Sequence, residues 1–164
     1  MYLQHLSRIS RMAMSIISVL IAICGMFIGG CTSGQPEGPP AEPQTKRTVT
    51  FAGHEWGVKY GDQLGPGPNF FSDSQDSLWV DEKGYLHMTV IQREGKWFCT
   101  EVINSQSLGY GSYVFTLQTR VDRLDENIIL GMFTWDTDAP EYNYREIDLN
   151  SANGKRPRMK THSL

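Results

Sequence analysis

The chain has 164 residues, a formal net charge of −3 and 11% aromatic residues. It lacks the excess of basic residues that nucleic-acid-binding domains use to contact phosphates, so we expect no nucleic-acid partner. Plentiful glycine, aromatic and β-branched residues fit a globular all-β domain and exclude a largely disordered chain.

The N-terminal segment has the pattern of an export signal. Two arginines precede an apolar stretch, residues 12–27, which has the length of a signal peptide rather than of a membrane span. It ends in the sequence I-G-G-C, which is typical of a bacterial lipobox whose Cys is acylated. We therefore predict that residues 1–31 are a lipoprotein signal peptide and that Cys31 is lipidated. The protein would be exported and anchored to the outside of the cell membrane; the alternative is an uncleaved single anchor helix.

Residues 32–47 are rich in Pro, Gly, Glu and Gln and show no apolar period. This composition predicts a flexible tether between membrane and domain. Of the three cysteines, only Cys99 would remain in the exported domain without lipid, so no internal disulfide is expected. Cys99 lies in an apolar run and is interpreted as a small core residue.

From residue 48 onward the apolar residues alternate with a period of two, which indicates β-strands. Residues 61–69 contain three glycines and two prolines and are predicted to be a loop. Strands separated by turns or polar loops are predicted at residues 49–51, 56–58, 77–81, 85–90, 97–103, 113–121 and 128–135. No helix is predicted after the signal peptide, and the regular spacing of strands favours a β-sandwich.

The predicted strand at residues 113–121 has two distinct faces. The apolar face carries Tyr113, Phe115, Leu117 and Val121, and the other carries Val114, Thr116, Gln118 and Arg120. The next strand, residues 128–135, is apolar throughout, as expected for a strand covered on both sides.

The stretch R-E-I-D-L-N at residues 145–150 alternates acidic and apolar side chains. On a strand, Glu146 and Asp148 would share one face, while Ile147 and Leu149 would face the core. The next position on the acidic face is Asn150. Two carboxyls on one strand face are suited to acid–base chemistry, but an amide neither donates nor accepts a proton at neutral pH.

Three landmarks in order, Y-G-S-Y at 110–113, F-T-W at 133–135 and E-I-D at 146–148, resemble glycoside hydrolase family 16, the β-glucanases whose hallmark is E-[IL]-D-[IL]-E. The resemblance implies a concanavalin A-like jelly-roll β-sandwich, present as a partial domain at residues 48–149 whose C-terminal half is missing. It also implies retaining hydrolysis of a β-glucan-like extracellular polysaccharide.

By this resemblance Glu146 takes the position of the nucleophile and Asp148 that of the helper that influences its pKa. Asn150 occupies the acid/base position and is not competent, so we expect this chain to be inactive. Contacts to the carbohydrate are implied for Asn69 and Glu101. Trp135 and Tyr144 would offer aromatic surfaces to the sugar.

The residues themselves leave structural alternatives open. Glu146 and Asp148 would also fit the solvent-facing side of an antiparallel strand, and Glu101 would also fit an ion pair with a neighbouring Lys or Arg. At the level of function, the alternatives are a non-catalytic carbohydrate-binding module and a structural surface lipoprotein.

No cofactor or metal is predicted. His54 and His87 occur singly, without a second ligand at metal spacing, and are interpreted as surface residues. A structural calcium occurs in the family but is not supported by these residues. Trp56, Trp79 and Trp97 are interpreted as core side chains.

The tail, residues 150–164, differs from the preceding domain. It contains five basic residues, no acid and no strand period. When permitted codons are read one base out of frame, the tail begins E-F-S-K-W, which restores the missing Glu and a family motif. We therefore predict that the tail is aberrant and arose by a frameshift.

Overall fold

The computed structural model describes residues 2–3, 16–23, 44–104, 106–109, 111–152 and 158–161, with side chains between 44 and 151. In this part of the chain the elements are β-strands and two short 3₁₀ turns, so the all-β prediction is confirmed. The described residues form no helix long and apolar enough to cross a membrane.

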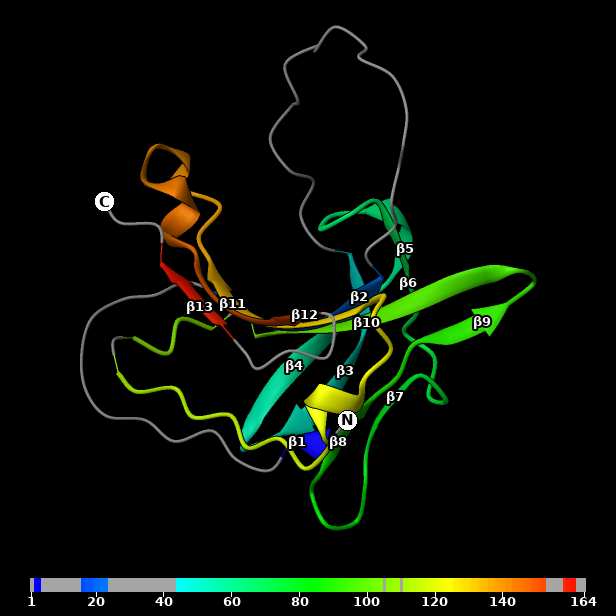
Figure 1. Ribbon diagram of the computed structural model, residues 1–164. Helices are drawn as coiled ribbons and strands as arrows, with labels where there is room; N and C mark the ends of the chain where they lie inside the picture. The colour runs from blue at the N-terminus through cyan, green and yellow to red at the C-terminus, as the bar shows by residue number, and fades with distance from the viewer. Residues whose placement is uncertain are drawn as a thin grey trace, which may run out of the picture.

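One large, curled and open sheet dominates the fold (Figure 1). Its main path runs, in spatial order, through β13 (Arg158–Thr161), β12 (Ile147–Ala152), β11 (Ile128–Trp135), β2 (Ile16–Ile23), β10 (Lys96–Asn104), β4 (His54–Lys59) and β3 (Thr45–Phe51). Three short strands pair beside this path, namely β5 (Gly61–Leu64), β6 (Asn69–Phe71) and β9 (Ile91–Arg93). A smaller sheet has the order β1 (Tyr2–Leu3), β8 (Leu86–Met88) and β7 (Leu78–Val80).

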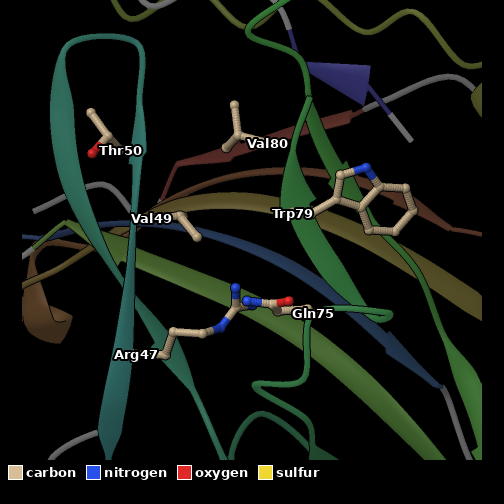
Figure 2. A pocket seen from close by; sticks show the side chains of 6 residues that line it. All are labelled: Arg47, Val49, Thr50, Gln75, Trp79 and Val80. Carbon is tan, nitrogen blue, oxygen red and sulfur yellow. The ribbon is translucent and has the colours of Figure 1, made fainter. Parts of the chain in front are cut away.

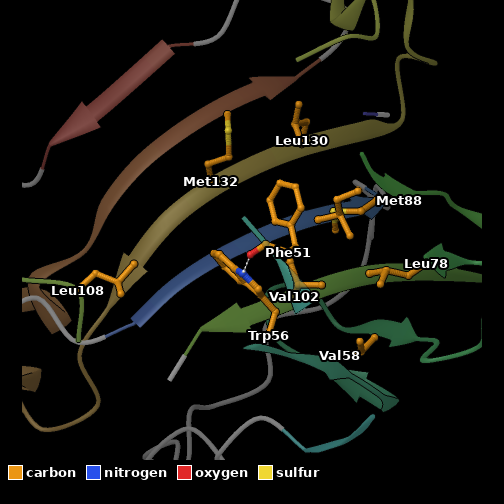
Figure 3. Packing of buried hydrophobic residues seen from close by; sticks show 10 residues of the cluster. Phe51, Trp56, Val58, Leu78, Met88, Val102, Leu108, Leu130 and Met132 are labelled. Atoms are coloured by element: carbon orange, nitrogen blue, oxygen red, sulfur yellow. Dashed lines mark hydrogen bonds between the residues drawn. The ribbon is translucent and has the colours of Figure 1, made fainter. Parts of the chain in front are cut away.

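The main core lies where the two sheets meet (Figure 3). Its buried side chains are Phe51, Trp56, Val58, Leu78, Leu86, Met88, Val102, Leu108, Leu130 and Met132. The indole of Trp56 donates a hydrogen bond of 2.9 Å to the carbonyl oxygen of Phe51, which satisfies its one polar group. The alternating apolar residues predicted these inward faces, and Cys99 is fully buried as predicted.

The segment 113–121 is not a strand in the structure, so that prediction is wrong. Residues 111–120 contain only an isolated bridge at Leu117, and a 3₁₀ turn, η1 (Val121–Arg123), follows. The position between β10 and β11 is taken instead by β2, which pairs antiparallel with both. β2 comes from the apolar stretch that we interpreted as a signal peptide.

Two more expectations about local structure need correction. The loop predicted at residues 61–69 contains β5, which pairs with β6 across the turn. The tail, in which no strand period was seen, contributes β13, which pairs with β12 from Ile147 to Asn150. The frameshift itself stays a prediction, and the DNA sequence across Leu149 would test it.

Two side chains are more exposed than expected. Trp97, interpreted as core, is 49% exposed because it lies near the tip of the β9–β10 hairpin. Ile147, expected to face the core, is 41% exposed at the start of β12, whereas Leu149 packs against the core as predicted.

An ion pair ties the chain before β7 to β9. Arg93 Nη2 donates to both carboxylate oxygens of Asp76, at 2.6 and 2.7 Å. Hydrogen bonds from Arg93 and Ser74 lower the pKa of Asp76 to about 2. Because the folded pKa is depressed, this contribution to stability is present above the usual pKa of 3.8 and is lost as the pH falls toward 2.

We therefore expect an NMR titration to place the midpoint of Asp76 near pH 2. In Arg93→Gln the midpoint should return toward 3.8, since the strongest donor is gone. The pair is exposed, so added salt should weaken the shift. An Asp76 midpoint that is the same in both proteins would contradict this assignment.

Candidate functional site

The residues predicted for the site gather on one face of the curled sheet. Leu130, Met132 and Leu149 point into the main core. Successive strand residues point to opposite faces, so Phe133 on β11 and Asp148 on β12 lie on the other side. These two residues are directly opposite each other in the β11–β12 register.

This second face is concave. Phe133 packs against a small cluster formed by Phe71 on β6 and Cys99 on β10, which lie on the other side of β2 in the sheet. Such a contact requires the sheet to curl around this face. We call it the concave face, and by alternation along their strands it carries Asn69, Glu101, Phe133, Trp135, Asp148 and Asn150.

The predicted catalytic residues form a row along β12. Glu146 immediately precedes the strand in extended conformation, Asp148 lies opposite Phe133, and Asn150 lies opposite Gly131. Four residues of strand span ~13 Å between Cα atoms. Two carboxyls of a retaining glycosidase are ~5 to 5.5 Å apart, so long side chains at 146 and 150 would have to lean together.

Register connects this row to Glu101. Leu20 on β2 is paired with both Glu101 on β10 and Gly131 on β11, and Gly131 is paired with Asn150. One transverse row of the sheet therefore contains Glu101, Gly131 and Asn150. Adjacent strands are ~4.8 Å apart, which puts Glu101 and Asn150 ~14 Å from each other along the sheet.

Glu101 is held in a buried ion pair, as its structural alternative predicted. Its carboxylate lies 2.8 Å from Lys59 Nζ, and the two side chains are only 3% and 9% exposed. Lys59 also donates to the carbonyl oxygen of Gly65, and its Nζ lies 4.4 Å from the ring centre of Phe71. Asn69 is buried beside this pair's loop and donates 2.6 Å to the carbonyl oxygen of Pro66.

The two aromatic residues predicted to contact sugar come together. The rings of Trp135 and Tyr144 stack at 4.2 Å with 12° between their planes. Tyr144 belongs to the 3₁₀ segment η2 (Pro140–Arg145) that joins β11 to β12. Asn143, Tyr144 and Arg145 all have φ near +50°, a strained conformation for residues other than glycine.

Polar contacts hold this strained turn in place. Asp136 N donates 2.8 Å to the carbonyl oxygen of Tyr144, and Arg145 Nη1 donates 2.9 Å to Asp136 Oδ2. The result is a half-exposed aromatic pair directly before the acidic row. Each ring uses one face for the stack, which leaves one outer face per ring for a ligand.

Sequence reasoning missed a second cluster, on the smaller sheet. His87, interpreted as a lone surface residue, stacks on Trp79 at 4.4 Å, and its Nε2 lies 2.8 Å from Asp81 Oδ2. The hydrogen bond with His87 is the main cause of a lowered pKa for Asp81. The hairpin pattern could have revealed it, since Trp79 and His87 are opposite in register.

A cavity of about 510 Å³ lies next to this cluster, away from the concave face (Figure 2). It is lined by Arg47, Val49 and Thr50 from β3 and by Gln75, Trp79 and Val80 from the β7 side. Arg47 donates 2.8 Å to the carbonyl oxygen of Leu78, which links the facing edges of the two sheets. Desolvation lowers the pKa of Arg47. None of the predicted site residues lines this cavity.

No family model, curated protein or solved structure matches this chain. Within the part that the structure describes, no three His, Cys, Asp or Glu residues are grouped as for a metal. The predicted lipidation residue, Cys31, lies outside the described residues. The functional argument therefore starts from the concave face.

Proposed function

We propose that this chain is a glycosidase-like domain related to retaining endo-β-glucanases, which binds a β-glucan-like polysaccharide and does not turn it over. The observation that carries the proposal is the row of Glu146, Asp148 and Asn150 on the concave face, with the Trp135–Tyr144 stack at its start. Aromatic faces bind the apolar faces of sugar rings, and a neighbouring carboxylate is a suitable nucleophile.

The row supports half of a retaining reaction. Glu146 would attack the anomeric carbon, and Asp148 would influence its pKa by hydrogen bonding. A proton must then reach the leaving oxygen, and later a water must be deprotonated. Asn150, at the position for both steps, has no proton to exchange at neutral pH. General acid catalysis contributes ~10² to 10⁴ in rate, so ordinary glucans should persist.

An activated aryl β-glucoside tests this proposal, because its leaving group needs little proton assistance. We expect Glu146 to form a glycosyl ester that accumulates, since no base activates water to remove it. Intact-protein mass spectrometry should show one added sugar, and peptide mapping should place it on Glu146. The label should be absent in Glu146→Gln.

The same measurements separate the rival functions. Binding to insoluble glucan without any label would favour a non-catalytic carbohydrate-binding module. The absence of both binding and label across a panel of glucans would favour a structural surface lipoprotein. Retention on glucan affinity gels provides the binding readout.

We further propose that the protein is exported and anchored to the membrane through lipidated Cys31, and that the curled sheet is one layer of a concanavalin A-like jelly roll. The lipobox pattern supports the anchor, and the all-β curled sheet supports the fold. Cys31→Ala should move the protein from the membrane fraction to the soluble fraction. Finding the unmodified protein wholly in the soluble fraction would contradict the anchor.

A further inference from the structure

The most unusual feature of the sheet is the origin of its strand β2. β2 lies between β10 and β11 and is antiparallel to both, so β10 and β11 run parallel to each other (Figure 1). The chain between Asn104 and Ile128 must therefore return along the sheet before β11 can begin. That returning segment contains residues 113–121, which lie outside the sheet except for the bridge at Leu117.

Residues 113–121 carry the pattern that a strand in this position needs. Tyr113, Phe115, Leu117 and Val121 already pack against the main core. The intervening residues are polar except for Val114, which is 47% exposed. This is the alternation expected of a strand with one face on the core and one face toward the concave side.

β2 itself has no such alternation. Its sequence, IISVLIAI, is apolar throughout apart from one serine. It also lies inside the stretch that we predict to be removed with the signal peptide. Removal would leave β10 and β11 with unpaired backbone groups facing each other, which is costly when those groups are buried.

We propose that residues 113–121 are an alternative strand for the β2 position and occupy it when β2 is absent. The direction is correct, because a strand that follows β10 and precedes β11 through two reversals is antiparallel to both. The turn predicted at residues 122–127 would place Val121 opposite Ile128 and, counting back three pairs, Gln118 opposite Gly131.

This register agrees with the pairing that β2 now makes. Glu101 and Gly131 share a row through Leu20, so Gln118 would take the place of Leu20 in that row. Two residues earlier, Thr116 would enter the row of Phe133 and Asp148. A one-residue slip would turn the apolar residues toward the concave face, so the alternation selects this parity.

The exchange adds polar groups to the candidate site. An amide at Gln118 and a hydroxyl at Thr116 would replace an apolar stretch next to the acidic row, and both groups can hydrogen-bond sugar hydroxyls. This consequence for ligand binding rests on the proposed function. The strand exchange itself depends only on pairing and packing.

Val19→Pro in the full chain provides the test. Val19 pairs with Val102 and Met132 in the middle of β2, where proline removes a ladder hydrogen bond. By hydrogen exchange we expect amides 113–121 to gain protection of about a hundredfold or more, while β10 and β11 stay protected. Val19→Ala is the matched control and should leave amides 113–121 unprotected.

A pair of cysteines tests the register independently. In a background with Cys24, Cys31 and Cys99 changed to Ala, Arg120→Cys with Ile129→Cys should form a disulfide when Val19→Pro is present. Thr119→Cys with Ile129→Cys, on opposite faces, should not. Global unfolding of Val19→Pro, or intact β10 and β11 with unprotected amides 113–121, would overturn the proposal.

The test also separates this proposal from the proposed function. Protection and cross-linking require no ligand, so they can succeed even if no glucan binds. If glucan does bind the Val19→Pro protein, Gln118→Ala should weaken retention on glucan gels there and have no effect in the Val19→Ala protein. An equal effect in both proteins would show that Gln118 does not act through the exchanged strand.

Discussion

Replacing Asn150 with Glu should raise the rate of glucan hydrolysis by ~10² to 10⁴ over that of the unmodified chain. A carboxyl at this position could protonate the leaving oxygen and then deprotonate the attacking water, while Glu146 serves as nucleophile. The register favours the substitution, because Asn150 is opposite Gly131 on β11 and that glycine presents no side chain. Release of reducing sugar from soluble β-glucan measures the gain.

Two variants control this prediction. Asn150→Gln has the size of glutamate but no exchangeable proton at neutral pH, so it should show no gain. Adding Glu146→Gln to Asn150→Glu should abolish the new activity, since the nucleophile is lost. In Asn150→Glu the glycosyl ester formed from an activated aryl glucoside should also be short-lived, because a base is now available for its hydrolysis.

If Asn150→Glu melts like the parent, binds glucan and hydrolyses it no faster than Asn150→Gln does, the enzyme-like interpretation fails. The binding-module alternative would then be the better account of the concave face. Such an outcome would leave the strand exchange untouched, because that exchange is measured without a substrate.

The sequence predicted most of the strands because their signals are local. β11 and the β7–β8 and β9–β10 hairpins were expected from apolar alternation or an apolar run and from Gly84 and Gly95, which have positive φ in their turns. Burial of Trp56 and Cys99 followed from the same patterns.

The partner of each strand was harder to predict, because pairing is non-local. Residues 113–121 have the alternation of a strand, yet β2 from the distant N-terminus fills the position that they match. Propensity describes how well a segment suits a pleated surface and does not choose between two segments that both suit it. The same limit hid the stack of Trp79 on His87, which exists only because β7 and β8 align them.

The candidate site was predicted as a set of positions, while its contacts had to come from the structure. Alternation placed Asp148 and Asn150 together on one face because that depends only on the period of a strand. The stack of Trp135 on Tyr144 depends on three consecutive residues with positive φ, which no sequence pattern announced. The partner of Glu101 depends on the pairing of β4 with β10, two strands far apart in the chain.

That partner gives the second large expected effect: Glu101→Gln should lower the free energy of unfolding by ~3 to 5 kcal/mol. The substitution leaves Lys59 buried at 9% side-chain exposure without its carboxylate, and an unpaired buried charge is strongly destabilising. Urea denaturation with fluorescence detection measures the change, compared at equal m-values.

Two controls give this number its meaning. Lys59→Met combined with Glu101→Leu removes both charges and should cost far less than Glu101→Gln alone, because no charge is then left unpaired. Asp122→Asn breaks the exposed pair with Arg120, whose side chains are 44% and 65% exposed, and should cost ~0 to 1 kcal/mol. If Glu101→Gln costs no more than Asp122→Asn, the ion pair does not stabilise the concave face, and Glu101 would be available to bind carbohydrate as the family resemblance implies.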